Sequence, residues 1–145
     1  MRVGQFEIGF HFVGAAEMTR LNESFLRHKG STDVITFDYA ENLSQRRKAA
    51  KEKSGSQPLR AFAPLREIEI HGEIFICIDE AVAQAKRFRT SWQSELVRYA
   101  IHGVLHLLGY DDARAAVRRK MKREENRILR ELEAQLDLKK IGSEK

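Results

Sequence analysis

The stretch at residues 102–112 reads HGVLHLLGYDD, and its two histidines stand four positions apart. On an α-helix, side chains at i and i+4 lie one turn apart on the same face, so His102 and His106 can direct their imidazoles at one small volume. Two ligands of one metal ion need this spacing. A histidine pair at the surface, or one that is hydrogen-bonded within the protein, has the same spacing and is the alternative.

The end of the same stretch predicts a third ligand. Gly109 can take a positive φ and end the helix, so that the chain turns back and brings the carboxylate of Asp111 or Asp112 towards the histidines. Two imidazole nitrogens and one carboxylate oxygen make a three-ligand site. Catalytic zinc sites differ from closed structural ones in keeping such an open position for water.

A zinc ion with three protein ligands lowers the pKa of its bound water to about 7 and withdraws charge from a phosphoryl or carbonyl oxygen. Both effects suit hydrolysis. Zinc peptidases of the HExxH type place a glutamate directly after the first histidine as general base. That position is Gly103 in this chain, which argues against a peptidase.

The 145 residues of the chain suit one domain, spanning residues 1–145, that can bury a core without disulfides. The one cysteine, Cys77, lies in an apolar run and is expected to be a small buried residue. No apolar run approaches the roughly 18 residues of a membrane span. The amino terminus also lacks the continuous apolar core of a signal peptide, so we expect a cytoplasmic protein without a membrane partner.

Lysine and arginine outnumber aspartate and glutamate by 26 to 21, and the excess is localised. Residues 40–65 form a polar, basic stretch that we interpret as a long exposed loop, and residues 113–145 are also rich in basic side chains. The loop is either a disordered segment without function or a binding site for a polyanion. Positive flanks around the histidine stretch favour a phosphate-rich substrate.

Apolar residues alternate with period two in some segments and with period 3.6 in others, which predicts a mixture of strands and helices. The predicted strands lie at 5–13, at 31–39 and, as one or two segments, at 67–78. The predicted helices run from Gly14 to about His28, over Glu80–Phe88 with Asp79 as N-cap, from a capping box at Thr90 and Gln93 through the histidines, and from Ala113 onward. In the histidine helix the residues expected to face the core are Trp92, Leu96, Tyr99, Ala100, Gly103 and Leu107, with the histidines at the edge of this stripe.

The stretch HGVLHLLGYDD, together with LN at 21–22, STDVITFDY at 31–39 and GEIFICIDEA at 72–81, resembles the YbeY family of bacterial endoribonucleases and ribosomal RNA maturation factors. The resemblance runs from about residue 20 to about residue 128. It implies an α+β fold with a mixed sheet of about four strands packed by helices. A zinc site is implied at the start of the last helix pair.

The resemblance also implies an activity and its partners. The expected reaction is zinc-dependent cleavage of single-stranded RNA, in maturation of the 3′ end of 16S ribosomal RNA and in ribosome quality control. The expected partners are ribosomal RNA and the small ribosomal subunit. One zinc ion is expected, held by His102, His106 and Asp112.

Asp112 departs from the family pattern, which most often has a third histidine at this position. Aspartate is an accepted zinc ligand, although its negative charge leaves the ion a weaker Lewis acid. Alternatively, Asp112 caps the next helix, and Asp111 or water completes the coordination.

A second departure concerns an arginine that the family carries four positions after the Asn and that is thought to contact the scissile phosphate. Leu26 occupies that position here, and Arg27 follows it. One step along a helix rotates a side chain by about 100°. The equivalence of Arg27 with the family arginine therefore cannot be assumed. Arg27, which would reach the site from the end of the helix, is the candidate catalytic residue. The basic loop is the alternative source of this positive charge.

Two other functions fit parts of the sequence. A non-catalytic RNA-binding ribosome-assembly factor with a vestigial or structural metal would tolerate both departures. A metallohydrolase that acts on a substrate other than nucleic acid would need the metal site without the basic surfaces.

Overall fold

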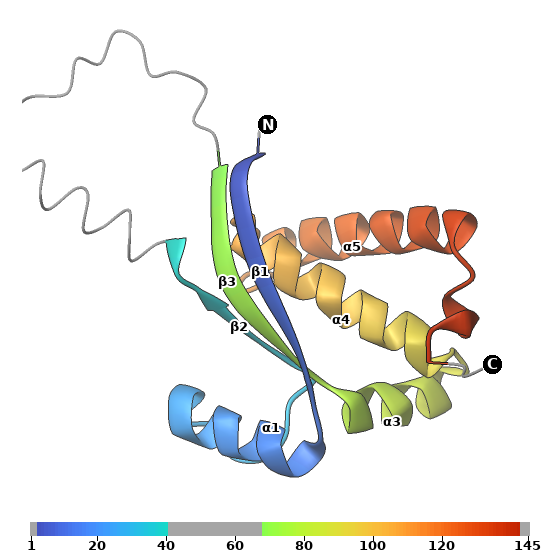
Figure 1. The fold of residues 1–145 in the computed structure, drawn as a ribbon, viewed down its shortest axis with the longest axis horizontal. Coiled ribbons are helices and arrows are strands. Elements are labelled where there is room, and N and C mark those ends of the chain that lie inside the picture. Colours follow the sequence, from blue (N-terminus) through green and yellow to red (C-terminus); the bar gives the residue numbers. More distant parts are fainter. Residues whose placement is uncertain (1–2, 41–67, 143–145) are drawn as a thin grey trace, which may run out of the picture.

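The computed structural model describes residues 3–40 and 68–142. Within them a mixed sheet and four α-helices form an α+β fold, which confirms the predicted class (Figure 1). The elements, in chain order, are β1 (Val3–Val13), α1 (Ala15–Leu21), the π-helical turn η1 (Asn22–Leu26), β2 (Val34–Asp38), β3 (Ile68–Cys77), α3 (Ile78–Phe88), α4 (Trp92–Leu107), α5 (Ala115–Gln135) and the 3-10 turn η2 (Leu138–Lys140).

The described part of the sheet has three strands in the order β1-β3-β2, so the expected number of about four was wrong. The region at 67–78, predicted as one or two strands, forms the single strand β3. This strand is central: β1 pairs with it in parallel from Phe6↔Ile70 to Val13↔Cys77, and β2 pairs antiparallel from Val34↔Ile76 to Asp38↔Gly72. Pairing on both edges keeps β3 continuous through Gly72.

Side chains of β3 alternate between two cores, as the pleat of a strand requires. Ile74 and Ile76 are fully buried on the face that packs against α4, together with Leu96, Tyr99 and Leu107 of that helix. Cys77 points to the other face, where it is buried against Met18 of α1. The predicted buried role of Cys77 is confirmed.

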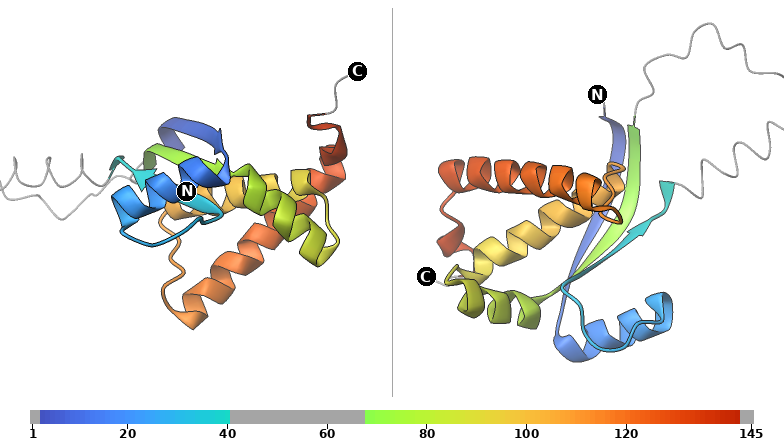
Figure 2. Two further views of the ribbon diagram at one scale, coloured as in Figure 1. Left: turned by 90° about the horizontal axis from the view of Figure 1, so that it is seen from below. Right: turned by 180° about the vertical axis from the view of Figure 1, so that it is seen from behind.

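Helix α4 lies between the sheet and α5 (Figures 1 and 2). Its sheet side carries the stripe that the sequence predicted, while its opposite side builds a second core with α5 and η2. The buried residues of that second core are Ile101, Leu105, Met121, Leu129 and Leu138. One helix thus connects the sheet to the carboxy-terminal part of the fold.

The helix predicted between Gly14 and His28 is shorter and irregular. It continues from α1 into the π-helical turn η1 and ends where Arg27 takes the left-handed conformation, with φ of 55°. Phe25 and Leu26, which lie within the predicted helix, are exposed because the wider turn rotates them away from the core.

The helix caps also differ from the predictions. Asp79 lies in the first turn of α3 and does not cap it: its Oδ2 accepts from the backbone N–H of Ala15 (2.7 Å) and so satisfies the start of α1. Helix α4 is capped by Ser91, whose Oγ accepts from the N–H of Ser94 (3.1 Å), and Thr90 donates to Glu95 instead (2.8 Å).

The last long helix, predicted from Ala113 onward, begins at Ala115. No helix in the described part of the chain has the length and apolar character needed to cross a membrane. The predicted basic loop at about 40–65 lies, apart from its first residue, outside the described residues.

Candidate metal centre

The three predicted ligands come together at the end of α4. Nε2 of His102 lies 3.1 Å from Nε2 of His106. Oδ2 of Asp112 lies 3.8 Å from the first of these nitrogens and 3.7 Å from the second. One atom from each residue therefore faces a common point, as the helical spacing predicted.

The turn after α4 brings the carboxylate to the histidines. Gly109 has a φ of 94°, and its N–H donates to the carbonyl of His106 (3.0 Å), so the helix ends at Leu107, one residue after the second histidine. The two aspartates then have different roles. Asp111 accepts from the N–H of Ala113 (2.9 Å), while Asp112 is the one whose carboxylate faces the histidine pair.

Both imidazoles are held through their other nitrogen. Nδ1 of His106 donates to the carbonyl of Tyr110 (3.1 Å), and Nδ1 of His102 donates to Oε2 of Glu125 (3.1 Å). A proton fixed on Nδ1 leaves the lone pair on Nε2. This is the arrangement of metal-binding histidines, whose second ring nitrogen is bonded to a carboxylate or a carbonyl.

Glu125 is the functional residue that the sequence reasoning missed. Only 3% of its surface is exposed. Besides His102, it accepts from Nη1 of Arg98 (3.1 Å) and from Nζ of Lys122 (2.7 Å). Burial alone would raise the pKa of Glu125, but the hydrogen bonds from His102, Lys122 and Arg98 outweigh it and lower the pKa to about 2.

A signal for Glu125 is present in the sequence. It stands four residues after Met121 and four before Leu129, both of which are buried on α5. A carboxylate in the middle of an apolar stripe must have a partner, because an unpaired buried charge is costly. One partner, Lys122, stands three residues before Glu125 on the same helix. The other two, His102 and Arg98, lie on α4, 23 and 27 positions before Glu125, so the sequence alone does not identify them.

The donor set fits a zinc ion. Two ligand atoms at about 2.1 Å from a tetrahedral ion are separated by about 3.4 Å, and the three observed separations lie within 0.4 Å of this value. The trio of His102, His106 and Asp112 is half-buried, and two of its members, His102 and Asp112, line a cavity of about 230 Å³. Residues from four segments line it: Asp33, Arg98, Tyr99, His102, Asp112, Arg118, Met121, Lys122 and Glu125. An ion held here would have an open side.

Position 103, where HExxH peptidases carry their base, faces the sheet. A Cβ at Gly103 would lie 2.7 Å from Cγ2 of Ile74, so no side chain fits without displacing the core. The general base of a peptidase therefore has no place at this position.

Arg27, the candidate catalytic residue, is exposed at the end of η1. Its side chain forms no hydrogen bond or ion pair with another described residue, and it does not line the cavity beside the trio. Leu26, at the position of the family arginine, is exposed too. The structure brings together the two histidines and Asp112, but not Arg27.

The sequence is similar to known proteins over most of its length. The family described as Endoribonuclease YbeY matches residues 2–133. Proteins with this name from Chlorobium phaeovibrioides and Salinibacter ruber are both 36% identical; the alignments cover 85% and 76% of this chain, and 66% and 60% of the relatives. The chain therefore spans slightly less than two thirds of the length of these two relatives. A third, from Chlorobium luteolum, is 33% identical over 87% of this chain and 74% of its own.

The fold is also similar to that of a solved structure. The solution structure of a protein from Thermotoga maritima matches with a TM-score of 0.52 and 25% identity, covering 92% of this chain and 75% of the other. The family match and the relatives agree with the resemblance noted in the sequence. The chain belongs to the YbeY family.

Proposed function

We propose that this protein is a zinc-dependent endoribonuclease that cleaves single-stranded RNA at the centre formed by His102, His106 and Asp112. The observation that carries the proposal is the convergence of their three ligand atoms beside an open cavity. Relatives that share most of the chain are named endoribonucleases, which supports RNA as the substrate. We further propose that residues 1–145 form a single domain of this kind.

The residues of the centre have two roles: three would bind the ion, and others orient the imidazoles. His102, His106 and Asp112 would hold the ion, and Glu125 and the carbonyl of Tyr110 fix the two imidazoles so that both Nε2 atoms face it. A bound zinc ion supplies a more acidic water and withdraws charge from a phosphoryl oxygen. Asp112 adds a negative charge to the set, which weakens the second effect relative to a third histidine.

Arg27 is our proposed contact to the substrate phosphate. It would act from the end of η1, where its guanidinium has no competing partner among the described residues. Replacing Arg27 by Ala is expected to lower kcat for RNA cleavage by about 10- to 100-fold while zinc content and melting temperature stay unchanged. Full activity in the R27A variant would remove Arg27 from the site.

The biological setting is part of the same proposal. Maturation of the 3′ end of 16S ribosomal RNA and ribosome quality control, in the cytoplasm and on the small ribosomal subunit, fit an RNA nuclease of this family. The net charge of +5 supports binding to such a polyanionic partner.

The test compares two histidine variants. The purified protein is expected to retain about one zinc ion, and His106→Ala should remove both the ion and the cleavage of a single-stranded RNA. His28→Ala is the matched control, because His28 is exposed and its side chain forms no hydrogen bond or ion pair with the described residues of the centre. Metal-free protein that cuts the RNA as fast as the zinc-loaded form contradicts the proposal.

A non-catalytic RNA-binding assembly factor is the second candidate. Asp112 in place of the usual histidine and the position of Arg27 away from the trio favour it. It predicts RNA affinity that falls steeply with salt and is unchanged in the His106→Ala variant, with no turnover by either protein.

A further inference from the structure

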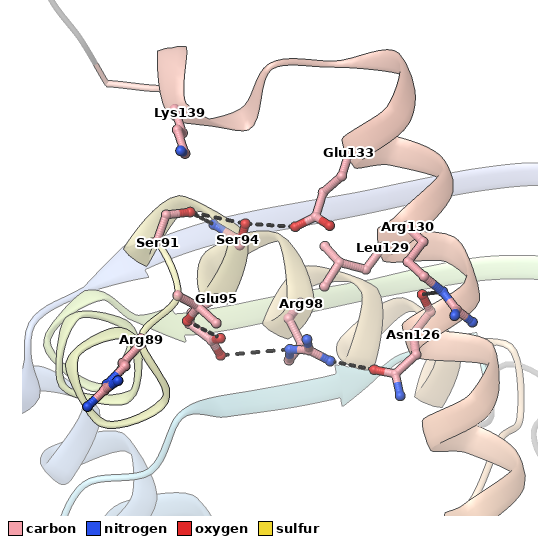
Figure 3. Close-up of a pocket in the computed structure, with 11 residues that line it drawn as sticks. Arg89, Ser91, Ser94, Glu95, Arg98, Asn126, Leu129, Arg130, Glu133 and Lys139 are labelled. Atoms are coloured by element: carbon pink, nitrogen blue, oxygen red, sulfur yellow. Dashed lines mark hydrogen bonds and ion pairs between the residues drawn. The ribbon is translucent and has the colours of Figure 1, made fainter.

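A second, larger pocket lies between α4 and α5 and shares Arg98 with the cavity at the metal centre. This pocket has a volume of about 690 Å³ and is lined by residues from the start and middle of α4, the second half of α5 and η2 (Figure 3). Arg98 lines both cavities. We call the two cavities together the α4–α5 groove. It comprises the nine residues that line the first cavity, given above, and the further residues that line the second: Arg89, Thr90, Ser91, Ser94, Glu95, Asn126, Leu129, Arg130, Glu133 and Lys139.

Contacts between the helices show that the groove is linear. Going back along α4, His102 contacts Glu125, Arg98 contacts Asn126 (2.7 Å) and Ser94 contacts Glu133 (2.9 Å). The residue numbers fall on one helix as they rise on the other, so the helices run antiparallel. The groove therefore follows α4 from His102 back to Ser91, a length of about 16 Å at a rise of about 1.5 Å per residue.

The acidic side chains of the larger pocket are already engaged. Glu95 accepts from Thr90 (2.8 Å) and lies 3.8 Å from Nε of Arg98. Glu133 accepts from the hydroxyl of Ser94 (2.9 Å). Figure 3 shows Arg98 between Glu95 and Asn126, and the contact of Ser94 with Glu133 beside it. These carboxylates are thus partly neutralised by groups of the groove wall.

Three cations around the larger pocket have no acidic partner within the described ranges. Arg89 and Lys139 form no side-chain hydrogen bond there, and Arg130 donates only to the backbone carbonyl of Asn126 (3.2 Å). All three are exposed. Such cations can exchange their counterions for the phosphates of a bound strand, which is the main source of affinity for nucleic acids.

A fourth cation lies at the metal end. Arg118 donates through Nε to the backbone carbonyl of Asp112 (3.0 Å), which places its guanidinium beside the trio. Arg98 and Lys122 also line this cavity, but both are bonded to Glu125. Of the three cations that line this cavity, Arg118 is therefore the one whose guanidinium forms no ion pair with a described carboxylate.

We propose that the α4–α5 groove is the path of the RNA substrate: one phosphate lies against Arg118 at the metal centre, and phosphates on one side of it lie against Arg130, Arg89 and Lys139. This inference rests on the proposed endoribonuclease function. A groove with free cations at both ends suits an extended polyanion better than a single phosphate ion. The 16 Å between the ends means that only a strand of several nucleotides contacts both.

The test is a triple variant, Arg89→Ala, Arg130→Ala and Lys139→Ala. The matched control replaces Arg20, Lys29 and Arg127 by Ala, which removes the same charge. Arg20 lies in α1 and Lys29 follows η1. Arg127 pairs with Glu124 and Glu131 on the outer side of α5. Affinity for a labelled single-stranded RNA of about eight nucleotides is measured by fluorescence anisotropy across a salt series. Cleavage of this RNA and of a dinucleotide is measured with zinc-loaded protein.

The groove variant is expected to bind the longer RNA about tenfold more weakly, with a salt slope smaller by about 2, since each lost phosphate contact on a single strand contributes about 0.7. KM for the longer RNA should rise about tenfold with kcat nearly unchanged, and the dinucleotide should be cleaved as before. Arg118→Ala is expected to slow both substrates, because it acts at the metal end.

Failure of the groove and failure of the enzyme are distinguishable. If the groove variant and the control bind and cleave alike while His106→Ala abolishes cleavage, the groove inference is overturned and the endoribonuclease proposal stands. If RNA affinity depends on the groove cations but no RNA is cut, the groove is supported and the catalytic proposal fails. Equal weakening in the control variant also overturns the groove, because it shows a non-specific charge effect.

Discussion

Helix α4 has two sides that follow different rules. The side towards the sheet is apolar and closely packed: Gly103 leaves no space beside Ile74, and Leu96 and Leu107 are buried. Between this side and the core shared with α5 runs a polar stripe, Ser94, Arg98, His102 and His106, at a spacing of four residues. The first side fixes where the helix lies, and the stripe contains the two histidines of the candidate metal centre.

The sheet side and the polar stripe differ in the contacts that their side chains need. Apolar packing requires only side chains of the right size and period, whereas each polar group on the stripe requires particular partners on α5 or in the turn. We therefore expect substitutions on the sheet side to change stability and substitutions at the stripe to change metal binding.

The largest effect is expected from acid. The pKa of Glu125 in the folded protein, about 2, lies below its ordinary value of 4.5. A lowered pKa stabilises the fold fully above the ordinary pKa, and this contribution, about 3 kcal/mol, is lost as the pH falls from about 4.5 towards 2. Urea unfolding of the metal-free protein across this range measures it. Glu125→Gln should flatten the dependence, and an unchanged slope would show that Glu125 is not ion-paired.

Glu125→Gln should also weaken zinc binding by about 10- to 100-fold, because His102 loses the carboxylate that orients it. Glu124→Gln is the matched control, since Glu124 is its neighbour and pairs only with Arg127 on the outer side of α5. Competition with a zinc chelator measures both affinities. Equal affinities in the two variants would remove Glu125 from the centre.

Gly103→Ala tests the sheet side. The new Cβ must displace the buried side chain of Ile74, and we expect a loss of about 1–2 kcal/mol after allowing for the better helix propensity of alanine. Zinc affinity should change little. A large fall in zinc affinity with unchanged stability would contradict the separation of the two sides.

The smallest effect is expected at Tyr99, which lies on the border between the two sides. Its Oη is buried without a hydrogen-bond partner among the described residues, and burial raises its pKa. Tyr99→Phe removes an unsatisfied polar atom, so thermal unfolding should show stability unchanged or higher by up to about 1 kcal/mol. A clear loss of RNA cleavage would instead place the hydroxyl in contact with substrate.

These expectations show how far the sequence alone could lead. The stripe from Trp92 to Leu107 and the meeting of His102 and His106 with a carboxylate follow from helical geometry and a glycine turn, so they could be predicted. The choice of Asp112 over Asp111 came from the family resemblance. Glu125 could not be assigned, because its contact with His102 depends on how α5 packs against α4. The count of about four strands came from the family resemblance, and periodicity could not correct it, because it does not show whether a segment near a glycine continues as one strand.

The start of the chain also contains a feature that periodicity did not predict. Periodicity extended α1 through Phe25 and Leu26, but a π-helical turn changes the direction of these side chains. The position of Arg27 depends on this turn, which has no clear sequence pattern. Local periodicity therefore predicted the arrangement of the two histidines on regular α4 better than the course of the chain before Arg27.

The most direct test of the central claim is a titration of zinc into metal-free protein with two readouts on the same samples. Calorimetry measures binding, and cleavage of a single-stranded RNA measures activity. We predict that activity rises with bound zinc and reaches its plateau at about one equivalent, the stoichiometry of a single three-ligand site. Cleavage that is complete before zinc is added, or that stays absent after the site is filled, would contradict the account.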